Sequence, residues 1–291
     1  MVATTALLWG SSYLWIAIGL EAFPPAVLAW LRLAMGAAIL FVLTRGRRRI
    51  ERRDWPGVAV VGVIGNAAPA LLFALAEERV ETAVVGMITG AAPLATLALA
   101  LALGLKSLRR THVVGLVLGF VGIIMMSAVN VTGDGASPLG VAFVLVAVAC
   151  YAVTAVALGP LQKKYGGMTV IFSAQVMATA AMSPYAAVQV GQSGFSVRSF
   201  VAVAILGILG TGVARAVHAN LIGRTGPARA GVVGYLVPVT AVILGVVVLS
   251  ETVSVVEIAG LGIVLIGASL TSSRTNATAA SMNHQLPHVS N

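Results

Sequence analysis

The chain has 291 residues, of which 59% are hydrophobic and only 9% are charged, and its formal net charge is +9 at pH 7. A soluble domain is about a quarter charged, because its surface must face water. This composition excludes an ordinary soluble globule and indicates that lipid is the solvent for most of the surface.

Ten apolar runs divide the chain. A helix of about 20 apolar residues crosses the roughly 30 Å of hydrocarbon in a bilayer. Since lipid offers no hydrogen bonds, the backbone groups of each run must pair with one another, so each run should be a helix. The expected spans cover residues 2–20, 25–44, 57–76, 82–104, 112–129, 139–158, 168–190, 199–217, 229–249 and 255–272.

The two ends of the chain differ in character. The first run has no basic residues before it and carries the polar stretch Trp9–Ser12 in its middle, so it is not expected to be a cleaved signal peptide. Residues 273–291 are polar and have no hydrophobic pattern, which predicts a disordered cytoplasmic tail.

Basic residues are concentrated in alternate loops. The loops on the other side hold only Arg79 and Arg198. Basic residues resist translocation, so the sequence predicts a multi-pass protein of the cytoplasmic (inner or plasma) membrane with both termini in the cytoplasm. Topology also explains the positive charge, so the expected partner is the lipid bilayer and not nucleic acid. The side that is rich in basic residues carries Arg45, Arg47, Arg48, Arg49, Arg52, Arg53, Lys106, Arg109, Arg110, Lys163, Lys164, Arg224, Arg229 and Arg274.

The two halves of the sequence resemble each other. Four residues of the first half recur 145 positions later, and Lys106 falls opposite Glu251 at the same spacing. Because each half has five spans, the second half must enter the membrane upside down, as in transporters with inverted repeats. The expected fold is an all-α membrane protein whose ten transmembrane helices form two inverted five-helix repeats, residues 3–129 and 139–272. The matched pairs are Gly86 and Gly231, Pro93 and Pro238, Gly115 and Gly260, and Gly122 and Gly267.

Motifs in both halves are similar to those of the drug/metabolite transporter superfamily, specifically of proteins with two EamA domains. One departure is Lys106, where the family often has an acidic residue. The resemblance implies a secondary-active transporter of small metabolites, amino acids or drugs that works by alternating access, with export as the expected direction. It also implies a central cavity formed by spans one to four and six to nine. The motifs are Leu8–Tyr13, Pro25, Ala29–Arg32, Ala92-Pro93, Gly115, Gly122, Pro238, Ser250-Glu251, Gly260 and Gly267.

Polar and aromatic residues inside the spans are the candidates for contact with a solute. Hydroxyl, indole, phenol and amide groups can line a cavity and hydrogen-bond a small molecule, although the same groups also pack helices together. The candidates are Trp9, Ser11, Ser12, Tyr13, Trp15, Arg32, Asn66, Tyr151, Thr154 and Gln175.

Two arginines and two prolines raise alternatives that the sequence leaves open. Arg32 is deep enough in its span to be costly in lipid, so it either meets a substrate carboxylate or bonds backbone carbonyls. Arg215 is expected to snorkel from the cytoplasmic end of its span. Pro93 and Pro238 are either hinges for alternating access or fixed bends.

No catalytic, metal-binding or cofactor motif is found, so no enzyme activity, no metal and no cofactor are expected. The glutamates are interpreted as solvated loop charges. The alternatives to an exporter are an importer or facilitator of metabolites, or a receptor or scaffold that transports nothing. A small-molecule substrate is the expected partner, and a homodimer stays open.

Overall fold

The computed structural model describes residues 1–44, 49–132, 137–225 and 230–272. Within these ranges the regular structure is helical and contains no strand. The expectations for residues 45–48, for Arg229 and for the tail from residue 273 lie outside the described residues.

The first half of the chain forms a series of helices, several of which join end to end into one span. The segment η1 is a 3-10 helix and η2 is a π-helix. The elements are α1 (Val2–Gly10), α2 (Ser12–Leu20), α3 (Pro25–Leu43), η1 (Arg52–Asp54), α4 (Trp55–Ala59), η2 (Val60–Ala67), α5 (Ala68–Glu77), α6 (Thr82–Thr89), α7 (Ala92–Ala102) and α8 (Arg110–Thr132).

The second half has fewer interruptions, and η4 is again a π-helix. The prolines Pro25 and Pro138 start their helices at positions where a missing N–H costs nothing. The elements are α9 (Pro138–Tyr165), α10 (Gly167–Gln189), η3 (Val190–Gln192), α11 (Val197–Ile205), η4 (Leu206–Val213), α12 (Ala214–Thr225), α14 (Val233–Leu249) and α15 (Val255–Ser272).

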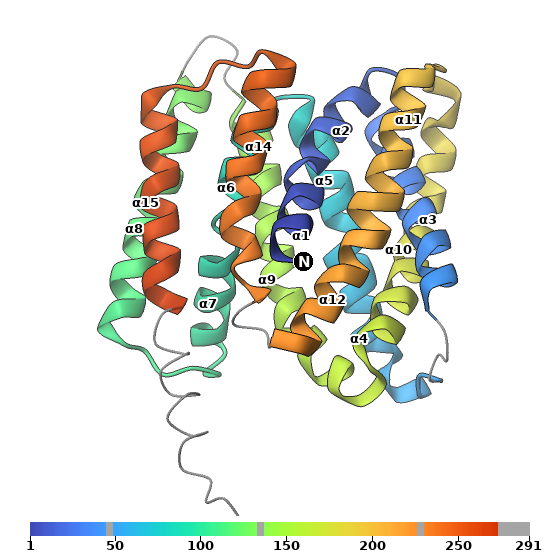
Figure 1. Ribbon diagram of the computed structural model, residues 1–291, viewed down its shortest axis with the longest axis horizontal. Coiled ribbons are helices and arrows are strands. Elements are labelled where there is room, and N and C mark those ends of the chain that lie inside the picture. Colours follow the sequence, from blue (N-terminus) through green and yellow to red (C-terminus); the bar gives the residue numbers. More distant parts are fainter. Residues whose placement is uncertain (45–48, 133–136, 226–229, 273–291) are drawn as a thin grey trace, which may run out of the picture.

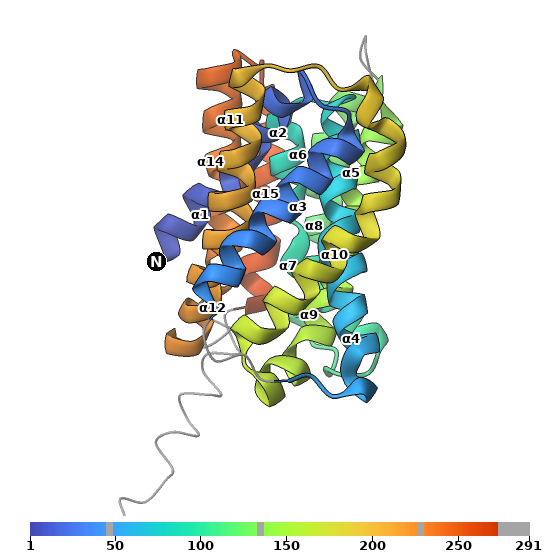
Figure 2. The same cartoon turned by 90° about the vertical axis from the view of Figure 1, so that its right-hand side faces the viewer.

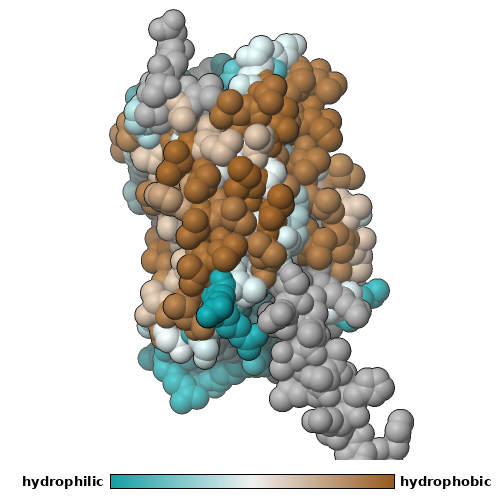
Figure 3. Space-filling view, turned by 90° about the vertical axis from the view of Figure 1, so that its left-hand side faces the viewer, coloured by the Kyte–Doolittle hydropathy of each residue, from teal (hydrophilic) through white to brown (hydrophobic). Residues whose placement is uncertain are grey.

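The helical spans are long and apolar enough for a membrane, as the composition predicts. Eight of them have at least 18 residues with high hydropathy, and Val233–Leu249 and Val255–Thr271 are shorter apolar helices. They run roughly side by side between two ends of the bundle (Figure 1). Figure 3 shows the corresponding hydrophobic band over one side, with hydrophilic residues below it.

The two ends of the bundle differ in charge. We call the end that carries Arg49, Arg52, Arg53, Lys106, Arg109, Arg110, Lys163, Lys164 and Arg224 the basic end, which is the lower end in Figure 1. We call the other end, which carries Glu21, Glu77, Glu78, Glu81, Glu251 and Glu257, the acidic end.

Three spans extend further toward the basic end than the sequence predicts. The third begins at Arg52, the sixth continues through Lys163 and Lys164 to Tyr165, and the eighth continues to Thr225. A helix that leaves the hydrocarbon keeps its hydrogen bonds in water, so a change from apolar to basic residues does not end it. Arg215 therefore lies well inside its helix instead of near the end.

A cluster of charges joins the start of the third span to the end of α9. The Lys164 ammonium lies 2.6 Å from Asp54 and 3.0 Å from Glu51, and Tyr165 donates a hydrogen bond to Asp54. The hydrogen bond from Lys164 lowers the pKa of the Glu51 carboxyl. These contacts attach the two spans to each other at the basic end.

The helices pack in a consistent set of pairs. The largest contact joins α8 to α15 at one edge of the bundle (Figure 1), α3 packs on α10, and α6 packs on α14. In addition α3 packs on η4 and α10 on η2, while α1 packs on α14 and α9 on α7. Figure 2 shows α3 crossing between α10 and α11 on the opposite edge.

Glycines allow α8 and α15 to approach closely. A Cβ atom on Gly267 would lie 2.6 Å from the carbonyl oxygen of Gly115, and one on Gly260 would lie 2.8 Å from that of Gly122. Helices in lipid associate largely by van der Waals packing, which small residues permit. The glycines that recur between the two halves of the sequence are thus packing residues in this contact.

We expect Gly267→Ala to destabilise the protein, because the new methyl group would push α8 and α15 apart. Overpacking of this kind costs about 1–3 kcal/mol. The thermal unfolding midpoint of the purified protein in detergent measures the effect. Gly262→Ala on the same helix is the matched control, since a Cβ there meets nothing within 4 Å. Equal midpoints for the two variants would contradict the packing role.

Candidate functional site

Arg32 lies in the interior of the bundle and contacts the eighth span. It follows the start of α3 by seven residues, and its Nε donates to the Thr211 hydroxyl at 3.4 Å. Thr211 in turn donates to the carbonyl of Leu206 at 3.0 Å. Gly36, one turn after Arg32, lets α3 approach both Thr211 and Gln175. The arginine is therefore directed toward protein groups and not toward lipid.

Two π-helices lie beside this arginine, one in the third span and one in the eighth. Each contains a buried polar side chain, Asn66 in η2 and Thr211 in η4, with exposed fractions of 3% and 2%. A π-helix shifts the hydrogen-bond register by one residue and is frequent at functional sites. The sequence analysis did not predict either of them. Their glycines, two in η2 and three in η4, were the available signal.

Asn66 and Gln175 have polar atoms without partners. Neither the nitrogen nor the oxygen of the Asn66 amide has a hydrogen-bond partner among the described residues. Gln175 donates through Nε2 to the Leu33 carbonyl at 3.1 Å, but its Oε1 is also unpartnered there. Buried amide groups are rarely left unpaired, because each costs about 1–3 kcal/mol. These amide atoms therefore remain open to a further hydrogen bond, and their role in binding a solute stays a prediction.

Arg215 and His218 continue the same helix face toward the basic end. Thr211, Arg215 and His218 follow one another at spacings of four and three residues, so they share one side of the span. The His218 ring packs against the indole of Trp9, with centroids 4.7 Å apart. Arg215 interacts electrostatically with Arg32 and with Tyr151. This side chain thus faces the interior, in contrast to the snorkelling position that the sequence suggested.

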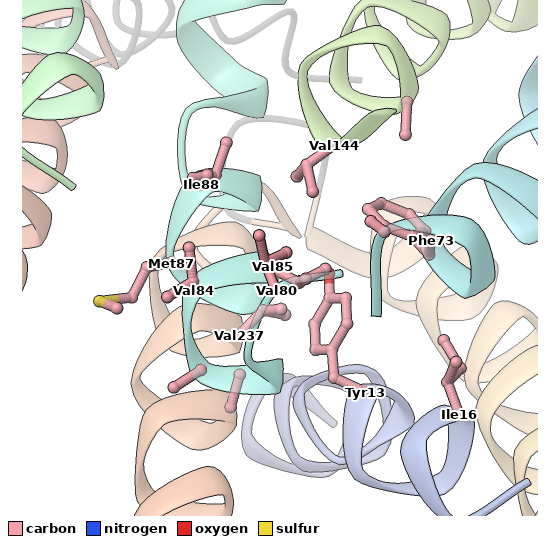
Figure 4. Packing of buried hydrophobic residues seen from close by; sticks show 14 of the residues in the cluster. Tyr13, Ile16, Phe73, Val80, Val84, Val85, Met87, Ile88, Val144 and Val237 are labelled. Carbon is pink, nitrogen blue, oxygen red and sulfur yellow. The ribbon is translucent and has the colours of Figure 1, made fainter. Parts of the chain in front are cut away.

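Aromatic side chains close the interior toward the acidic end. Tyr13 donates to the Thr89 hydroxyl at 2.9 Å and meets Phe73 edge to face, with centroids 5.6 Å apart. Tyr151 packs on the other side of Phe73 at 5.9 Å. Valines and isoleucines from α2, α6 and α9 surround these rings, as Figure 4 shows for Tyr13 and Phe73.

The remaining candidates mainly make helix contacts. The hydroxyls of Ser11 and Ser12 donate to the carbonyl of Leu8, and Thr154 donates to that of Cys150 and packs against Gly65. Trp15 packs against a small apolar cluster with Leu14, Leu244 and Leu249. A role for any of these residues in binding stays a prediction.

The two prolines of the repeat occupy different backbone settings. Pro93 follows a break in the helix, where α6 ends at Thr89 and α7 begins at Ala92, whereas Pro238 lies inside the continuous helix α14. They face each other's helices: Gly90 packs against Pro238 and Gly234 against Pro93. The break before Pro93 has no counterpart at Pro238, so the two prolines are not a matched pair in the backbone. A hinge role for either proline stays a prediction.

Two surface pockets lie away from this interior. One of about 560 Å³ lies at the acidic end, between the loops after α2 and α10, and includes Glu21, Glu78 and Gln189. The other, of about 380 Å³, lies at the basic end and includes Arg49, Arg52 and Thr169. Neither contains Arg32, Asn66 or the other interior candidates.

The glutamates of the acidic end include two helix caps. The Glu251 carboxylate accepts hydrogen bonds from the backbone N–H groups of Thr82 and Ala83, at 2.7 and 2.8 Å, in the first turn of α6. Glu257 forms a capping box with Ser254 at the start of α15. Burial, followed by the nearby Glu251 and Glu257 carboxylates, raises the pKa of Glu81. Glu251 and Glu257 are thus structural groups and not the solvated loop charges that the sequence suggested.

Comparisons with known proteins agree with this architecture. The chain matches the EamA-like transporter family over residues 1–128 and 138–273. YedA, an uncharacterized inner membrane transporter of Escherichia coli K12, is 29% identical over 266 residues, which cover 89% of this chain and 85% of the relative. An uncharacterized transporter of Archaeoglobus fulgidus is 24% identical, over 92% of this chain and 95% of its own.

One solved crystal structure aligns with 98% of this chain and 97% of its own length, with a TM-score of 0.63 and 24% identity. At this identity the likeness concerns the fold alone.

We expect Glu251→Gln to lower the stability of the protein almost as much as Glu251→Ala does. Both carboxylate oxygens accept backbone N–H groups, so an amide nitrogen in place of one oxygen would face a donor. The loss should be about 1–3 kcal/mol, measured as a lower unfolding midpoint in detergent. Glu78→Gln is the control at the same end, since Glu78 forms an ion pair near the surface with the neighbouring Arg79 and with no other described residue. An unchanged midpoint for Glu251→Gln would argue against the cap.

Proposed function

The chain belongs to the EamA-like transporter family, and on that premise we propose that it is a secondary-active carrier of a small solute. Two inverted five-helix repeats, residues 3–129 and 139–272, enclose the solute site and open it alternately to either side of the cytoplasmic membrane. The basic end is the cytoplasmic end, because basic residues resist translocation, and both termini are expected in the cytoplasm. Export is the expected direction, by resemblance to the family.

The pattern of helix contacts supports the inverted repeat. If each span of one half is exchanged for its counterpart in the other, the contact of α3 with η4 becomes that of α10 with η2. The contact of α1 with α14 likewise becomes that of α9 with α7, and the α8–α15, α3–α10 and α6–α14 contacts map onto themselves. A pseudo-twofold axis in the membrane plane produces this pattern.

Local backbone features agree with the same exchange. The π-helix η2 begins at Val60, and the π-helix η4 begins 146 residues later, at Leu206. The left-handed residues Gly104 (φ 67°) and Ser250 (φ 58°) also lie 146 residues apart. This spacing is one residue longer than the 145 residues that separate the matched glycines and prolines in the sequence, and it would set Leu105 opposite Glu251.

The observation that carries the proposal of a carrier is the set of polar groups in the interior. Asn66, Gln175 and Arg32 lie within the spans. Both polar atoms of the Asn66 amide and the Oε1 atom of Gln175 have no protein partner among the described residues. A receptor or scaffold has no need of such groups, which destabilise a membrane bundle unless something binds them. Transport of a solute accounts for them.

Exposure differs between the two halves of the interior. Tyr13, Phe73 and their apolar neighbours toward the acidic end are buried, with exposed fractions of 5% and 3% for the two rings. Trp9, Tyr151 and Arg215, which lie further toward the basic end, are half-buried. This arrangement fits a carrier that is closed on the outside and accessible from the cytoplasm.

Uptake and counterflow by purified protein in liposomes test the function directly. The panel contains amino acids, organic anions, nucleosides and cationic drugs. We expect saturable counterflow of at least one class. No flux above that of protein-free liposomes for any class would favour the receptor or scaffold alternative.

Thiol labelling tests whether the interior is wet. In a Cys150→Ala background, Tyr151→Cys should react with a membrane-impermeant maleimide in inside-out vesicles, because the proposed solute path would expose this position to water from the cytoplasm. Val146→Cys is the matched control on the same helix, since its side chain is 51% exposed on the apolar surface and faces lipid. Equal inertness of both positions would contradict a water-accessible interior.

A further inference from the structure

We propose that Arg32 and Arg215 form a binding site for an oxyanion group, carboxylate or phosphate, of a small organic anion. The inference rests on the proposed carrier function and names the substrate class. It follows from the positions of the two guanidinium groups and from what surrounds them.

Depth in the membrane is the first observation. Arg215 is the second residue of α12, directly after the π-helix η4, and the helix continues for ten residues to Thr225. At about 1.5 Å per residue this corresponds to roughly 15 Å of helix. Arg32 lies a similar distance from the basic end of α3. Both charges are therefore within the bundle and not at its ends.

The direction of the side chains is the second observation. Thr211, one turn before Arg215, receives the hydrogen bond from Arg32, and His218, one turn after it, stacks near Trp9. Residues on both sides of Arg215 thus face α3 and α1 in the interior. Its electrostatic interactions with Arg32 and with Tyr151 of α9 agree with this direction.

The balance of charge is the third observation. No carboxylate oxygen among the described residues lies within 4 Å of either guanidinium. Arg32 has a single long hydrogen bond, to Thr211, and interacts at greater distance with the carboxylate of Glu77. Arg215 has no hydrogen-bond or ion-pair partner in the described part of the chain, and neither arginine donates to a backbone carbonyl there.

An unpaired arginine in the interior of a membrane protein is destabilising, and the mutual repulsion of two such arginines adds to the destabilisation. A guanidinium presents five N–H donors in a fixed fork that matches the two oxygens of a carboxylate or phosphate group. A bound anion would satisfy both donor sets and remove the repulsion. A cationic solute would leave both donor sets unsatisfied and would be repelled by the two arginines.

The groups around the arginines fit an organic anion better than a bare inorganic ion. Tyr13 and Tyr151 interact with Arg32, and Tyr151 also with Arg215, while Phe73 packs between the two tyrosines and Trp9 packs on His218. These rings provide apolar surface near the cationic pair. Solute sites commonly combine such surface with a few polar groups that fix orientation. The carbon part of the solute would pack on these rings while its oxyanion group meets the arginines.

Labelling with phenylglyoxal tests the site in the wild-type protein without any substitution. We expect Arg215 in detergent-solubilised protein to react, and succinate or inorganic phosphate at millimolar concentration to protect it. Succinamide, which has the shape of succinate without its charge, should not. Arg224 on the same helix is exposed and should react equally in all samples. Protection by succinate alone assigns a carboxylate, protection by phosphate alone assigns a phosphate, and no protection by either overturns the proposal.

Counterflow of labelled succinate and of a cationic drug tests the same site by function. Arg215→Gln should reduce anion flux at least tenfold more than it changes cation flux. Arg215→Lys should retain part of the anion flux, and Arg224→Gln should retain all of the anion flux. A different result would overturn the anion site but not the carrier. In that case the wild type transports neutral or cationic solutes and no anion, and Arg32→Gln and Arg215→Gln leave this flux unchanged. Absence of flux for every solute would instead argue against the carrier.

Discussion

No water reaches the hydrocarbon of a bilayer to bond with a peptide group or a polar side chain, so a chain in lipid must satisfy such groups from within. Most of this structure follows from that requirement. The backbone of the spans is helical apart from short breaks such as the one between Thr89 and Ala92. Serine and threonine hydroxyls donate to the carbonyl one turn back, and the Glu251 carboxylate accepts from two N–H groups that α6 would otherwise leave unpaired. Some buried polar atoms in the described part of the chain break the rule, among them those of the Asn66 amide and Oε1 of Gln175. In the proposed carrier, these amides and the two interior arginines are the groups that a solute would satisfy.

Much of the architecture could be predicted from the sequence because hydropathy in lipid is a strong and local signal. The all-helical character and the family resemblance are confirmed, and eight of the ten expected spans are helices long and apolar enough to cross a membrane, while the last two are shorter apolar helices. Span ends toward the basic end were less accurate, since basic residues continue a helix into water. The glycines between α8 and α15 could be predicted as packing residues, because small residues in membrane helices typically permit a close contact with another helix.

The details of the site were harder to predict, because they depend on register and direction within a helix. The π-helices rotate the residues that follow them, so Arg215 faces inward although its distance from the predicted span end suggested snorkelling. Ser11 and Ser12 were candidates for solute contact by residue type, yet their hydroxyls are occupied by Leu8. Glu251 was interpreted as a loop charge because a cap to a helix 169 residues away in sequence leaves no local pattern.

The cap at Glu251 has a mechanical consequence for the transport cycle. The Glu251 carboxylate, two residues after the end of α14, binds the first turn of α6, and Pro238 and Pro93 pack against glycines along the same contact. Two helices that are bonded at one end and interlocked along their contact cannot slide past each other easily. If the proposed carrier opens at the acidic end, α6 and α14 would stay fixed against each other, and the movement would fall on neighbouring helices such as α2 and α5.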